Sequence, residues 1–593
     1  MKPNILCLVS EDCPPLLSSY GNDVAHTPHL DQLASEGITF ENAYCSSPVC
    51  APSRFAILTG RMAEASAPAH HMRSLGPAPS DTLTVPEMLR DAGYYCINNS
   101  KTDYNYNVDP NLIWDDCSAV AHWNNRPTGT PFFAVFNSMV THESCVFDES
   151  PLEFHPKDMT VPLHLPDLPS MRETIARYYS AVSRMDDELG ARLRELDDSG
   201  LTNDTIILYY SDHGSPLPRS KRFCYDEGLR VPLVLRLPNR WRSLLPQVPG
   251  SQVLSPVSLV DLMPSLALMA GIEAPDSIHG QPFIGEQHRP RKFVFSGRDR
   301  MDERYDLTRT VRSERFRYIR NYAPHRPWGQ HYAYAWLSTA YQDYERQWLD
   351  RKLCEQKARF WRHKPAEELY DCASDPNSIN NLVEDSHYSE ALAEMQAALD
   401  SHMLSICDMG FIPEFSDIET LEASRDPARY PLEEVIDLAS KAIRRDPATA
   451  EIFKELLDND KMVLRFWAAQ GLLMLAIEGY APPFSLLPYL TSERNPQVRV
   501  VLAEILGHLG ETNYATEVLL GYLDNSTNSR LKLQVLNALT YFVPMSELVL
   551  PRLVQLAKNS DPYIRNASEY LRLKLNGQYD PSSVIFRLDL MAK

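Results

Sequence analysis

The stretch DTIILYYSDHG, residues 204–214, is a near-continuous apolar run that ends in an acid and a histidine. Three similar runs precede it: NILCLVS at 4–10, YYCINNS at 94–100 and PFFAVFN at 131–137. Apolar residues at helical spacing between 171 and 196 predict a long helix just before the last run. Continuous apolar strands that alternate with helices predict an α/β fold, with a parallel sheet covered by helices on both faces.

Charged side chains stand at, or just beyond, the carboxyl ends of these strands. In such sheets, ligands bind outside that edge. A single charge at a strand end is more often solvated than functional, so the shared placement of several charges carries the inference. The residues concerned are Glu11, Asp12, Lys101, His142, Asp212 and His213.

The composition is that of a globular protein with several packed units. A chain of 593 residues exceeds what one core usually serves, so we expect two to four units. The 58 basic and 78 acidic residues give a formal net charge of −20, which argues against nucleic acid as the main partner because phosphate binding needs a net basic face. A local cluster of cations could still hold a small anionic substrate.

The N-terminal sequence MKPNILCLVSEDCPP carries no visible targeting signal. Its apolar run at 5–9 is too short for a signal-peptide core, and no stretch approaches the length of a membrane span. The eleven cysteines are odd in number and scattered, which favours reduced thiols. We therefore expect a cytoplasmic protein that does not bind membranes, or a periplasmic or secreted one if a leader has been removed.

After residue 291 the sequence changes character. KFVFSGRD and RFRYIRNYAP predict strands, and a helix is expected at 388–403. The stretch DMGFIPEFSDIETLEASRDPARYP has three prolines and no periodicity, which predicts a linker at 406–430.

From about residue 431 the sequence is helical and repetitive. In each unit a basic residue follows a polar turn and precedes an apolar helix, at spacings of 34, 33 and 33 residues. This pattern is typical of a stacked two-helix solenoid, and residues 431–593 resemble HEAT-type repeats. Such a solenoid either caps the preceding domain or offers a surface to a partner. The recurring residues are Arg465, Arg499, Lys532 and Arg565.

Cys50 lies in the stretch CSSPVCAPSRFAILTGR, residues 45–61. It could be half of a disulfide with Cys45, a zinc ligand, a packed thiol or a nucleophile. A zinc site needs a second close pair of cysteines or histidines, which this stretch lacks, and a packed thiol is the default for a lone cysteine. Against that default, CAPSRFAILTG matches C-x-P-S-R-x-x-L-x-T-G at six of its seven defined positions, with Ile57 in place of the leucine.

That string is the signature of type I sulfatases, and residues 1–405 resemble this family, within the alkaline-phosphatase-like superfamily. The resemblance implies a mixed sheet sandwiched by helices in a catalytic core at 1–290 and a small α+β subdomain at 291–405. Further similarity lies in PNILCLVSEDCPPLLSSYGND, YYSDHG, KRFCYDEGLRVPLVLR and EELYDCASDP. NSKTDYNYN, FNSMVTHES and SGRDRMDERYD resemble the heparan N-sulfatase-like branch.

In this family a separate maturation enzyme oxidises the motif cysteine to Cα-formylglycine, so the resemblance implies this modification at Cys50. A thiol would form a stable adduct with sulfur. The hydrate of the aldehyde instead offers two oxygens: one attacks sulfur, and the other expels sulfate as the aldehyde re-forms. The helix after Cys50 would point its N-terminal amides at the anion.

The resemblance also implies one divalent cation as a cofactor. Its ligands would be Glu11, Asp12, Asp212 and His213, with the oxygen derived from Cys50 completing the set. Oxygen ligands favour Ca²⁺ or Mg²⁺, and Ca²⁺ is the expected ion. Two positions depart from the family pattern: Glu11 stands where relatives usually carry aspartate, and His213 stands where many carry asparagine. Imidazole suits Mn²⁺ or Zn²⁺ better, and phosphonate monoester hydrolases of the superfamily also use histidine there.

Several cations receive roles by the same resemblance. Arg54 would hold the hydrate oxygen, and Lys101 would hold sulfate and formylglycine. His142 would contact sulfate or protonate the leaving group, and Lys221 would bind the ester oxygen. Each also has a simpler interpretation as a solvated or structural side chain. Candidates for substrate recognition are Arg219, for which a solvated loop is the alternative, and Arg298, Asp299, Arg300 and Asp302, for which a structural salt-bridge cluster is the alternative.

Three functions are compatible with these observations. The first is a sulfuric ester hydrolase acting on a sulfated small molecule or saccharide, including an N-sulfate. The second is a phosphonate monoester or phosphodiester hydrolase, favoured by His213 and by Asp103, which replaces a family histidine. The third is a catalytically silent scaffold whose repeats bind a partner, and the intact motif argues against it. A homo-oligomer is compatible with all three.

Overall fold

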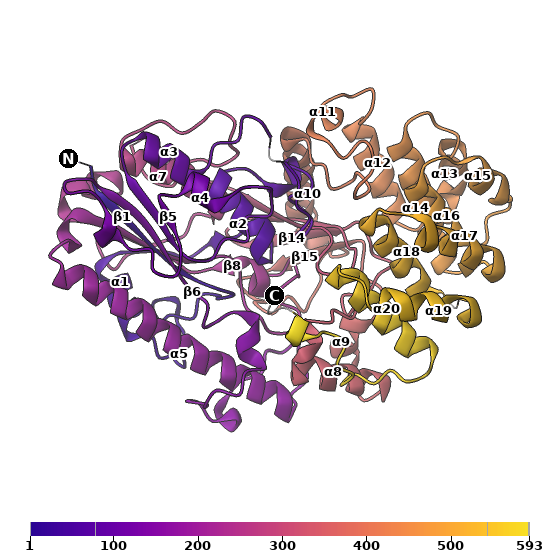
Figure 1. Ribbon diagram of the computed structural model, residues 1–593, viewed down its shortest axis with the longest axis horizontal. Coiled ribbons are helices and arrows are strands. Elements are labelled where there is room, and N and C mark those ends of the chain that lie inside the picture. Colours follow the sequence, from indigo (N-terminus) through magenta and orange to yellow (C-terminus); the bar gives the residue numbers. More distant parts are fainter. Residues whose placement is uncertain (1, 78, 287, 543, 591–593) are drawn as a thin grey trace. The chain divides into compact units, whose positions relative to one another are not determined.

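A computed structural model describes residues 2–77, 79–286, 288–542 and 544–590 (Figure 1). The chain forms two compact units. The first consists of Met1–Arg298, Arg309–Ile319 and Glu368–Leu399, and the second of Asp299–Thr308, Arg320–Glu367 and Asp400–Lys593.

An eight-stranded mixed sheet forms the centre of the first unit. The inner strands β7, β1, β6 and β4 are parallel, whereas β9 runs antiparallel to both β7 and β2. The mixed sheet and its α/β class confirm the predicted fold. The order is β10 (Gln252–Val253), β2 (Ile38–Phe40), β9 (Leu233–Arg236), β7 (Thr205–Ser211), β1 (Asn4–Ser10), β6 (Phe132–Ser138), β4 (Tyr95–Asn99) and β5 (Asp116–Cys117).

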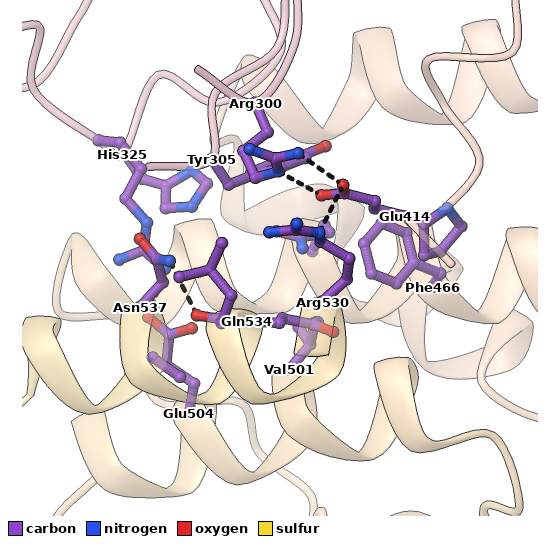
Figure 2. A pocket seen from close by; sticks show the side chains of 15 residues that line it. Arg300, Tyr305, His325, Glu414, Phe466, Val501, Glu504, Arg530, Gln534 and Asn537 are labelled. Carbon is purple, nitrogen blue, oxygen red and sulfur yellow. Dashed lines mark hydrogen bonds and ion pairs between the residues drawn. The ribbon is translucent and has the colours of Figure 1, made fainter. Parts of the chain in front are cut away.

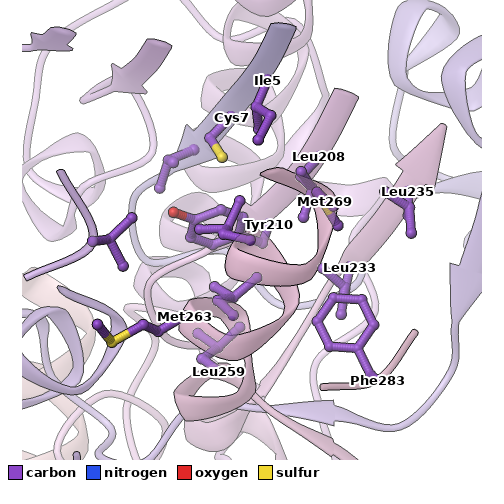
Figure 3. Close-up of a cluster of buried hydrophobic side chains, with 14 of the residues drawn as sticks. Ile5, Cys7, Leu208, Tyr210, Leu233, Leu235, Leu259, Met263, Met269 and Phe283 are labelled. Carbon is purple, nitrogen blue, oxygen red and sulfur yellow. The ribbon is translucent and has the colours of Figure 1, made fainter. Parts of the chain in front are cut away.

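Helices cover both faces of this sheet because alternate side chains of each strand point to opposite sides. Ile5, Cys7 and Val9 join one apolar cluster, to which α2, α3 and α7 contribute (Figure 3). Leu6 and Leu8 join the other cluster, with α1 and α5. The helices of the first unit are α1 (Pro28–Glu36), α2 (Cys50–Thr59), α3 (Val85–Asp91), α4 (Pro110–Ile113), α5 (Pro169–Asp198), α6 (Asp226–Leu229) and α7 (Leu262–Ala270).

Three neighbouring strands end at the same level, and this alignment positions the site. In the parallel pairs of β1 with β6 and with β7, Ser10 lies opposite both Ser138 and Ser211. Residues 11–12 and 212–213 therefore leave the sheet side by side at its carboxyl edge.

Two smaller sheets complete the strands. The first orders β11 (Val257–Ser258), β3 (Ala43–Tyr44) and β8 (Arg230–Val231). The second orders β12 (Val294–Arg298), β13 (Thr308–Arg312), β14 (Phe316–Asn321) and β15 (Glu367–Asp371). β12 and β14 lie within the predicted strands. α10 (Ser389–Ile406) begins one residue after the predicted start and extends three residues further.

The second unit is mainly helical, and its C-terminal helices pack in sequence order. α12, α14, α16, α18 and α20 each contact the next in this series, and α13, α17 and α19 pack beside them (Figure 1). The helices are α8 (Thr339–Leu349), α9 (Glu355–Ala358), α11 (Leu421–Ser424), α12 (Leu432–Ile443), α13 (Ala450–Leu456), α14 (Met462–Ile477), α15 (Leu487–Ser492), α16 (Pro496–His508), α17 (Thr512–Asn525), α18 (Ser529–Tyr541), α19 (Ser546–Leu556) and α20 (Pro562–Leu575).

The recurring arginines of this region have one structural role. Each lies in the first turn of its helix, and its guanidinium donates a hydrogen bond to the carbonyl oxygen six residues earlier. The bond closes the polar turn that precedes the helix, which accounts for the periodic basic position. The three bonds are Arg465 to Asn459 (2.9 Å), Arg499 to Glu493 (3.1 Å) and Arg565 to Asn559 (3.0 Å).

Two further observations concern the whole described chain. No helix within the described ranges is long and apolar enough to cross a membrane. All eleven cysteines lie in the described part of the chain, and none of them is paired in a disulfide.

Candidate active site

Cys50 is the first residue of α2 and is buried at the carboxyl edge of the sheet, with 1% of its surface exposed. Four predicted site residues surround its sulfur. Their distances to Sγ are 3.3 Å from His213 Nε2, 3.7 Å from Glu11 Oε2, 3.8 Å from Asp12 Oδ1 and 3.9 Å from Lys221 Nζ. The structure thus brings together a helix start and two strand ends that are far apart in sequence.

Two groups of potential metal ligands share this cysteine. Ligand atoms of Asp12, Cys50, Asp212 and His213 lie within 4.8 Å of one another, and all four residues are buried. Glu11 instead groups with Cys50 and His142 within the same limit. Four of the five residues predicted to bind the metal therefore form one cluster. The fifth, Glu11, lies next to that cluster through its proximity to Cys50.

His213 is oriented by the backbone carbonyl of the next residue. Its Nδ1–H donates to the Gly214 carbonyl at 3.0 Å, which leaves Nε2 facing Asp12 Oδ1 at 2.8 Å. Burial alone would lower the pKa of His213, but Asp12 and Asp212 outweigh it and hold the pKa well above the ordinary value. The pocket therefore favours positive charge at this point. Two carboxylates and an oriented imidazole fit a divalent cation.

Asp12 is fixed by contacts from several segments. Its backbone adopts a left-handed conformation (φ 47°), and its N–H donates to Asp212 Oδ1 at 3.1 Å. Its Oδ2 accepts from Lys221 Nζ at 2.6 Å and from the Glu143 N–H at 2.7 Å. Burial opposes ionisation, but Lys221 and His213 hold the pKa of Asp12 well below its usual range. A buried, ionised carboxylate is therefore presented to the cluster.

Arg54 lies one helical turn after Cys50 and binds the acids of the site. Its Nε donates to Asp212 Oδ2 at 3.1 Å, and its Nη2 contacts Glu11 Oε1. Lys101 Nζ lies 3.6 Å from Glu11 Oε2. Arg54 and Lys101 therefore lie beside Cys50 and are held there by their contacts with Glu11 and Asp212.

His142 stands just after β6. The Ser144 N–H donates to its Nδ1 at 3.3 Å, which places the proton of the neutral imidazole on Nε2. Burial and the Lys221 cation lower the pKa of His142 to about 4. Near neutral pH, His142 is therefore a neutral hydrogen-bond donor.

Sequence reasoning missed a buried ion pair behind this site. Arg222 and Glu143 are joined by two bonds of 2.7 and 3.0 Å, and the Arg222 N–H donates to the Pro48 carbonyl at 2.7 Å. The pair follows His142 and Lys221 directly in sequence, and that adjacency was the available signal. The run RSKR suggests a solvated loop, and only the fold shows that its last arginine is buried.

A second missed residue is Asn137 in β6, the strand that neighbours β1. Its Oδ1 accepts from Arg54 Nη1 at 3.0 Å, and its Nδ2 donates to Asn98 Oδ1 at 2.9 Å. An asparagine near the end of a strand has no distinctive sequence signal.

The predicted substrate-recognition residues are held by other groups. Arg219 donates to the Asn377 carbonyl at 2.8 Å and stacks over Tyr225, and Arg298 lies over the ring of Phe223. Arg300 and Asp302 belong to the second unit, where Arg300 donates to the Asp302 carbonyl at 2.6 Å. Their role in recognition stays a prediction, as does that of the neighbouring Asp299.

Comparisons with known proteins bear on this geometry. The family model described as Sulfatase matches residues 3–111 and 95–272. An ulvan-active sulfatase from Formosa agariphila is 36% identical over 472 residues, which cover 71% of this chain and 78% of the relative. The human N-sulphoglucosamine sulphohydrolase is 26% identical over 460 residues, which cover 67% of this chain and 89% of the relative.

Solved structures share the α/β fold. A protein solved in complex with its substrate D-glucosamine-2-N,6-O-disulfate has a TM-score of 0.50 at 18% identity, covering 69% of this chain and 99% of that one. The phosphonate monoester hydrolase from Silicibacter pomeroyi has a TM-score of 0.51 at 17% identity, covering 70% and 97%. At these identities the likeness concerns the fold alone. The family match and the likeness to the ulvan-active sulfatase show that the chain belongs to the sulfatase family, and it is a sulfuric ester hydrolase.

Proposed function

We propose that this chain hydrolyses sulfate esters of a carbohydrate, with a formylglycine derived from Cys50 as the nucleophile. The observation that carries the proposal is the convergence of Cys50 with Asp12, Asp212 and His213 at one edge of the sheet. The C-x-P-S-R part of the maturation motif, which is fully matched at 50–54, supports the modification, for which the partner would be a formylglycine-generating enzyme.

The surroundings of Cys50 disfavour the thiol itself as the nucleophile. Burial raises the pKa of the Cys50 thiol above its ordinary value, so the unmodified residue would be protonated and weakly nucleophilic. A hydrated aldehyde offers one hydroxyl for attack on sulfur and a second whose collapse expels sulfate. The first amides of α2 would face the bound anion.

Asp12, Asp212 and His213 would hold a divalent cation, with Glu11 beside them. Such a cation supplies positive charge that favours the ionised nucleophile and draws electron density from sulfate. Three carboxylates favour Ca²⁺, the ion we propose, whereas His213 makes Mn²⁺ the main alternative and Mg²⁺ a further one.

The remaining polar side chains would bind and orient the ester. Arg54 and Lys101 would position the hydrate and the sulfate oxygens, because both already contact the acids beside Cys50. Lys221 would neutralise charge on the ester oxygen. His142, neutral with its proton on Nε2, would donate a hydrogen bond to a sulfate oxygen or to the ester oxygen.

The relatives suggest the class of substrate. One is named for its activity on ulvan, and the other for N-sulphoglucosamine. We therefore propose a sulfated saccharide as the natural substrate, with O-sulfate before N-sulfate because the ulvan-active relative is the more similar of the two. Sulfate release from ulvan oligosaccharides and from N-sulfoglucosamine, measured side by side, tests this order. Release from neither would remove the carbohydrate assignment.

A second candidate is hydrolysis of a phosphonate monoester or phosphodiester. His213 favours it, because hydrolases of that kind carry histidine at the corresponding position. Comparison of kcat/KM for an aryl sulfate, phosphonate monoester, phosphodiester and phosphate monoester with one shared leaving group separates the candidates. The aryl sulfate should have the highest kcat/KM. A clearly higher kcat/KM for the phosphonate monoester or the phosphodiester would support the second candidate instead.

We also propose that residues 431–593 are HEAT-type repeats. The packing order of α12 to α20 and the shared turn bond of three repeat arginines support this assignment. The domain division expected from sequence, with a core at 1–290 and a subdomain at 291–405, belongs to the same proposal.

A further inference from the structure

The charged cavity of the second unit has a structural explanation (Figure 2). Arg300 donates to both oxygens of Glu414 at 2.7 and 2.9 Å, and Arg326 pairs with Glu504. Figure 2 shows Arg530 also turned toward Glu414, which it meets at 3.7 Å. These side chains bind one another across the cavity, so they account for its charge without a ligand.

In the first unit, two asparagines connect the two cations beside Cys50. Asn137 Oδ1 accepts from Arg54 Nη1 at 3.0 Å, and Asn137 Nδ2 donates to Asn98 Oδ1 at 2.9 Å. Asn98 Nδ2 donates in turn to the Lys101 carbonyl at 2.9 Å. Asn98 stands in β4 and Asn137 in β6, and these strands are parallel neighbours. The Asn98–Asn137 pair therefore links the guanidinium of Arg54 to the segment that carries Lys101.

The direction of these three hydrogen bonds follows from the chemistry of the groups. A guanidinium only donates and a backbone carbonyl only accepts, so the oxygen of Asn137 must face Arg54 and the amino group of Asn98 must face the Lys101 carbonyl. The middle bond then runs from the Asn137 amino group to the Asn98 oxygen. Reversing either amide would place a donor against a donor and an acceptor against an acceptor.

Arg54 has three anchors, and Asn137 is the neutral one. Its Nε and Nη2 meet Asp212 and Glu11, acids of the proposed metal site, whereas Nη1 meets Asn137. Asn137 is therefore a partner for which a bound cation would not compete. A guanidinium has five N–H groups, so three anchors leave two for the ester.

The Asn98–Asn137 pair adjoins apolar surroundings. A cavity of about 50 Å³ is lined by Arg54, Asn98, Lys101 and Asn137, and all its other lining residues are aliphatic or aromatic. Asn98 is 1% exposed. Hydrogen bonds are stronger in such surroundings than in water, and the loss of one partner leaves the other at a high cost.

We propose that the Asn98–Asn137 pair sets the position of Arg54 relative to Lys101, so that both cations bind one ester group together. Both asparagines are positioning residues, because they act through Arg54 and Lys101. The roles of these two cations toward the ester rest on the proposed function, whereas the link between them rests on the three hydrogen bonds. Loss of the pair should lower kcat more than it raises KM, since the charges remain and only their alignment is lost.

Leucine has nearly the shape of asparagine and forms no side-chain hydrogen bond, so Asn137→Leu and Asn98→Leu break the link without opening space for water. Each should lower kcat on an aryl sulfate about tenfold or more, with a change in KM of less than about threefold. Because both break the same link, the double variant should lose little more than the weaker of the two enzymes. Unchanged kcat in both single variants, or losses that multiply in the double variant, would overturn the proposal.

Aspartate tests the direction of the bonds and replaces leucine if leucine disturbs folding. Asn137→Asp keeps the acceptor that faces Arg54, so it should retain more kcat than Asn137→Leu. Asn98→Asp cannot donate to the Lys101 carbonyl, so it should not recover activity relative to Asn98→Leu. Equal kcat in Asn137→Asp and Asn137→Leu would mean that the bond to Arg54 positions nothing.

Asn4→Leu is the matched control at the opposite edge of the sheet. Asn4 Oδ1 accepts from the Phe132 N–H at 3.2 Å, and its Nδ2 lies 3.5 Å from Thr205 Oγ1, so it also joins neighbouring strands. The variant should lower stability in urea unfolding and leave kcat and KM unchanged. A loss of kcat equal to that of Asn137→Leu would mean that any break between strands has this effect.

Crystal structures of wild type and Asn137→Leu separate this proposal from the proposed function, because they need no turnover. The spacing between the Arg54 guanidinium and the Lys101 ammonium should differ between the two proteins by about 1 Å or more. Absence of sulfate release by the wild-type enzyme would contradict the proposed function and leave this comparison standing. Identical spacing in the two structures would overturn the link between the two cations.

Discussion

Arg222 and Glu143 form a buried bidentate ion pair that joins the two loops carrying Lys221 and His142. The pair also reaches the nucleophile segment, because the Arg222 N–H donates to the Pro48 carbonyl. The Glu143 N–H meanwhile holds Asp12 Oδ2. One ion pair thus sets the relative positions of groups proposed to bind metal, sulfate and the leaving oxygen.

We predict that Arg222→Lys lowers kcat by about tenfold to a hundredfold, with a smaller change in KM, because lysine keeps the charge and loses the bidentate geometry. Steady-state kinetics on an aryl sulfate measures both constants. The matched control is Arg236→Lys, whose ion pair with Glu36 is partly exposed, and it should leave both constants unchanged. A loss in Arg222→Lys that falls entirely on KM would show that the pair positions nothing needed for turnover.

Removal of a cluster carboxylate should abolish metal binding. Asp212→Ala deletes an acid that meets both Arg54 and the Asp12 N–H, so the variant should retain no stoichiometric divalent ion after dialysis and should lose turnover. Elemental analysis of the dialysed protein gives the ion content independently of activity. Asp204→Ala, an exposed acid before β7, is the control. Full activity of the wild-type enzyme after thorough chelation would contradict the metal assignment.

The central sheet could be predicted from sequence because its strands are buried on both faces and read as continuous apolar runs. The ends of the predicted runs at 4–10, 94–100, 131–137 and 204–214 agree with those of β1, β4, β6 and β7 to within three residues. The short outer strand β2 and the antiparallel β9 were not predicted from the pattern. Their pairing is set by long-range contacts, and at three and four residues each segment is too short for its pattern to indicate a strand.

The site was predictable where chemistry and motif spacing coincide, as at Cys50 and the strand-end acids. The residues that hold these groups in place could not be predicted. Glu143, Arg222 and Asn137 are ordinary polar residues, and only the fold determines how deeply they are buried. Arg300 was predicted as a substrate ligand, but local sequence could not show that Glu414, more than a hundred residues later, meets its guanidinium. Spacing identifies the residue types of a site but does not show their partners.

The C-terminal helices should be needed for the second unit to fold. Trp467 of α14 is 1% exposed, donates to the Phe411 carbonyl at 2.9 Å and packs on Tyr322. Trp467→Ala should therefore destabilise the protein by about 3–5 kcal/mol, measured by urea unfolding. Removal of residues 431–593 would uncover Phe411 and Tyr322 and should produce aggregation. A truncated enzyme that stays soluble, monodisperse and fully active would show that the helices serve a partner instead.

Glu303 makes the stability of the protein depend on pH. Burial and the neighbouring Asp302 raise the pKa of Glu303 to about 7, above its value of about 4.3 in an unfolded chain. The folded state therefore holds this proton more tightly, so the contribution of Glu303 to stability is fully present below pH of about 4.3 and is lost as pH rises to about 7. Its carboxyl accepts from the Ala333 N–H at 2.6 Å, a bond that glutamine can keep.

Glu303→Gln should remove this loss, so the variant should gain up to about 3 kcal/mol over wild type between pH 5 and 8. Urea unfolding of both proteins at the two pH values gives the difference. Glu433→Gln, at an exposed position of α12, should follow wild type at both. Parallel pH dependence of Glu303→Gln and wild type would mean that Glu303 is ionised in the folded protein.

The central claim is that Cys50 is the precursor of a formylglycine nucleophile. Mass spectrometry of the tryptic peptide that ends at Arg54, taken from enzyme produced beside a maturation system and assayed in the same preparation, tests it most directly. The account predicts that the aldehyde or its hydrate replaces the thiol in a fraction of molecules that rises in proportion to aryl sulfatase activity, and that Cys50→Ala has neither. Fully active enzyme in which Cys50 is entirely an unmodified thiol would contradict the account.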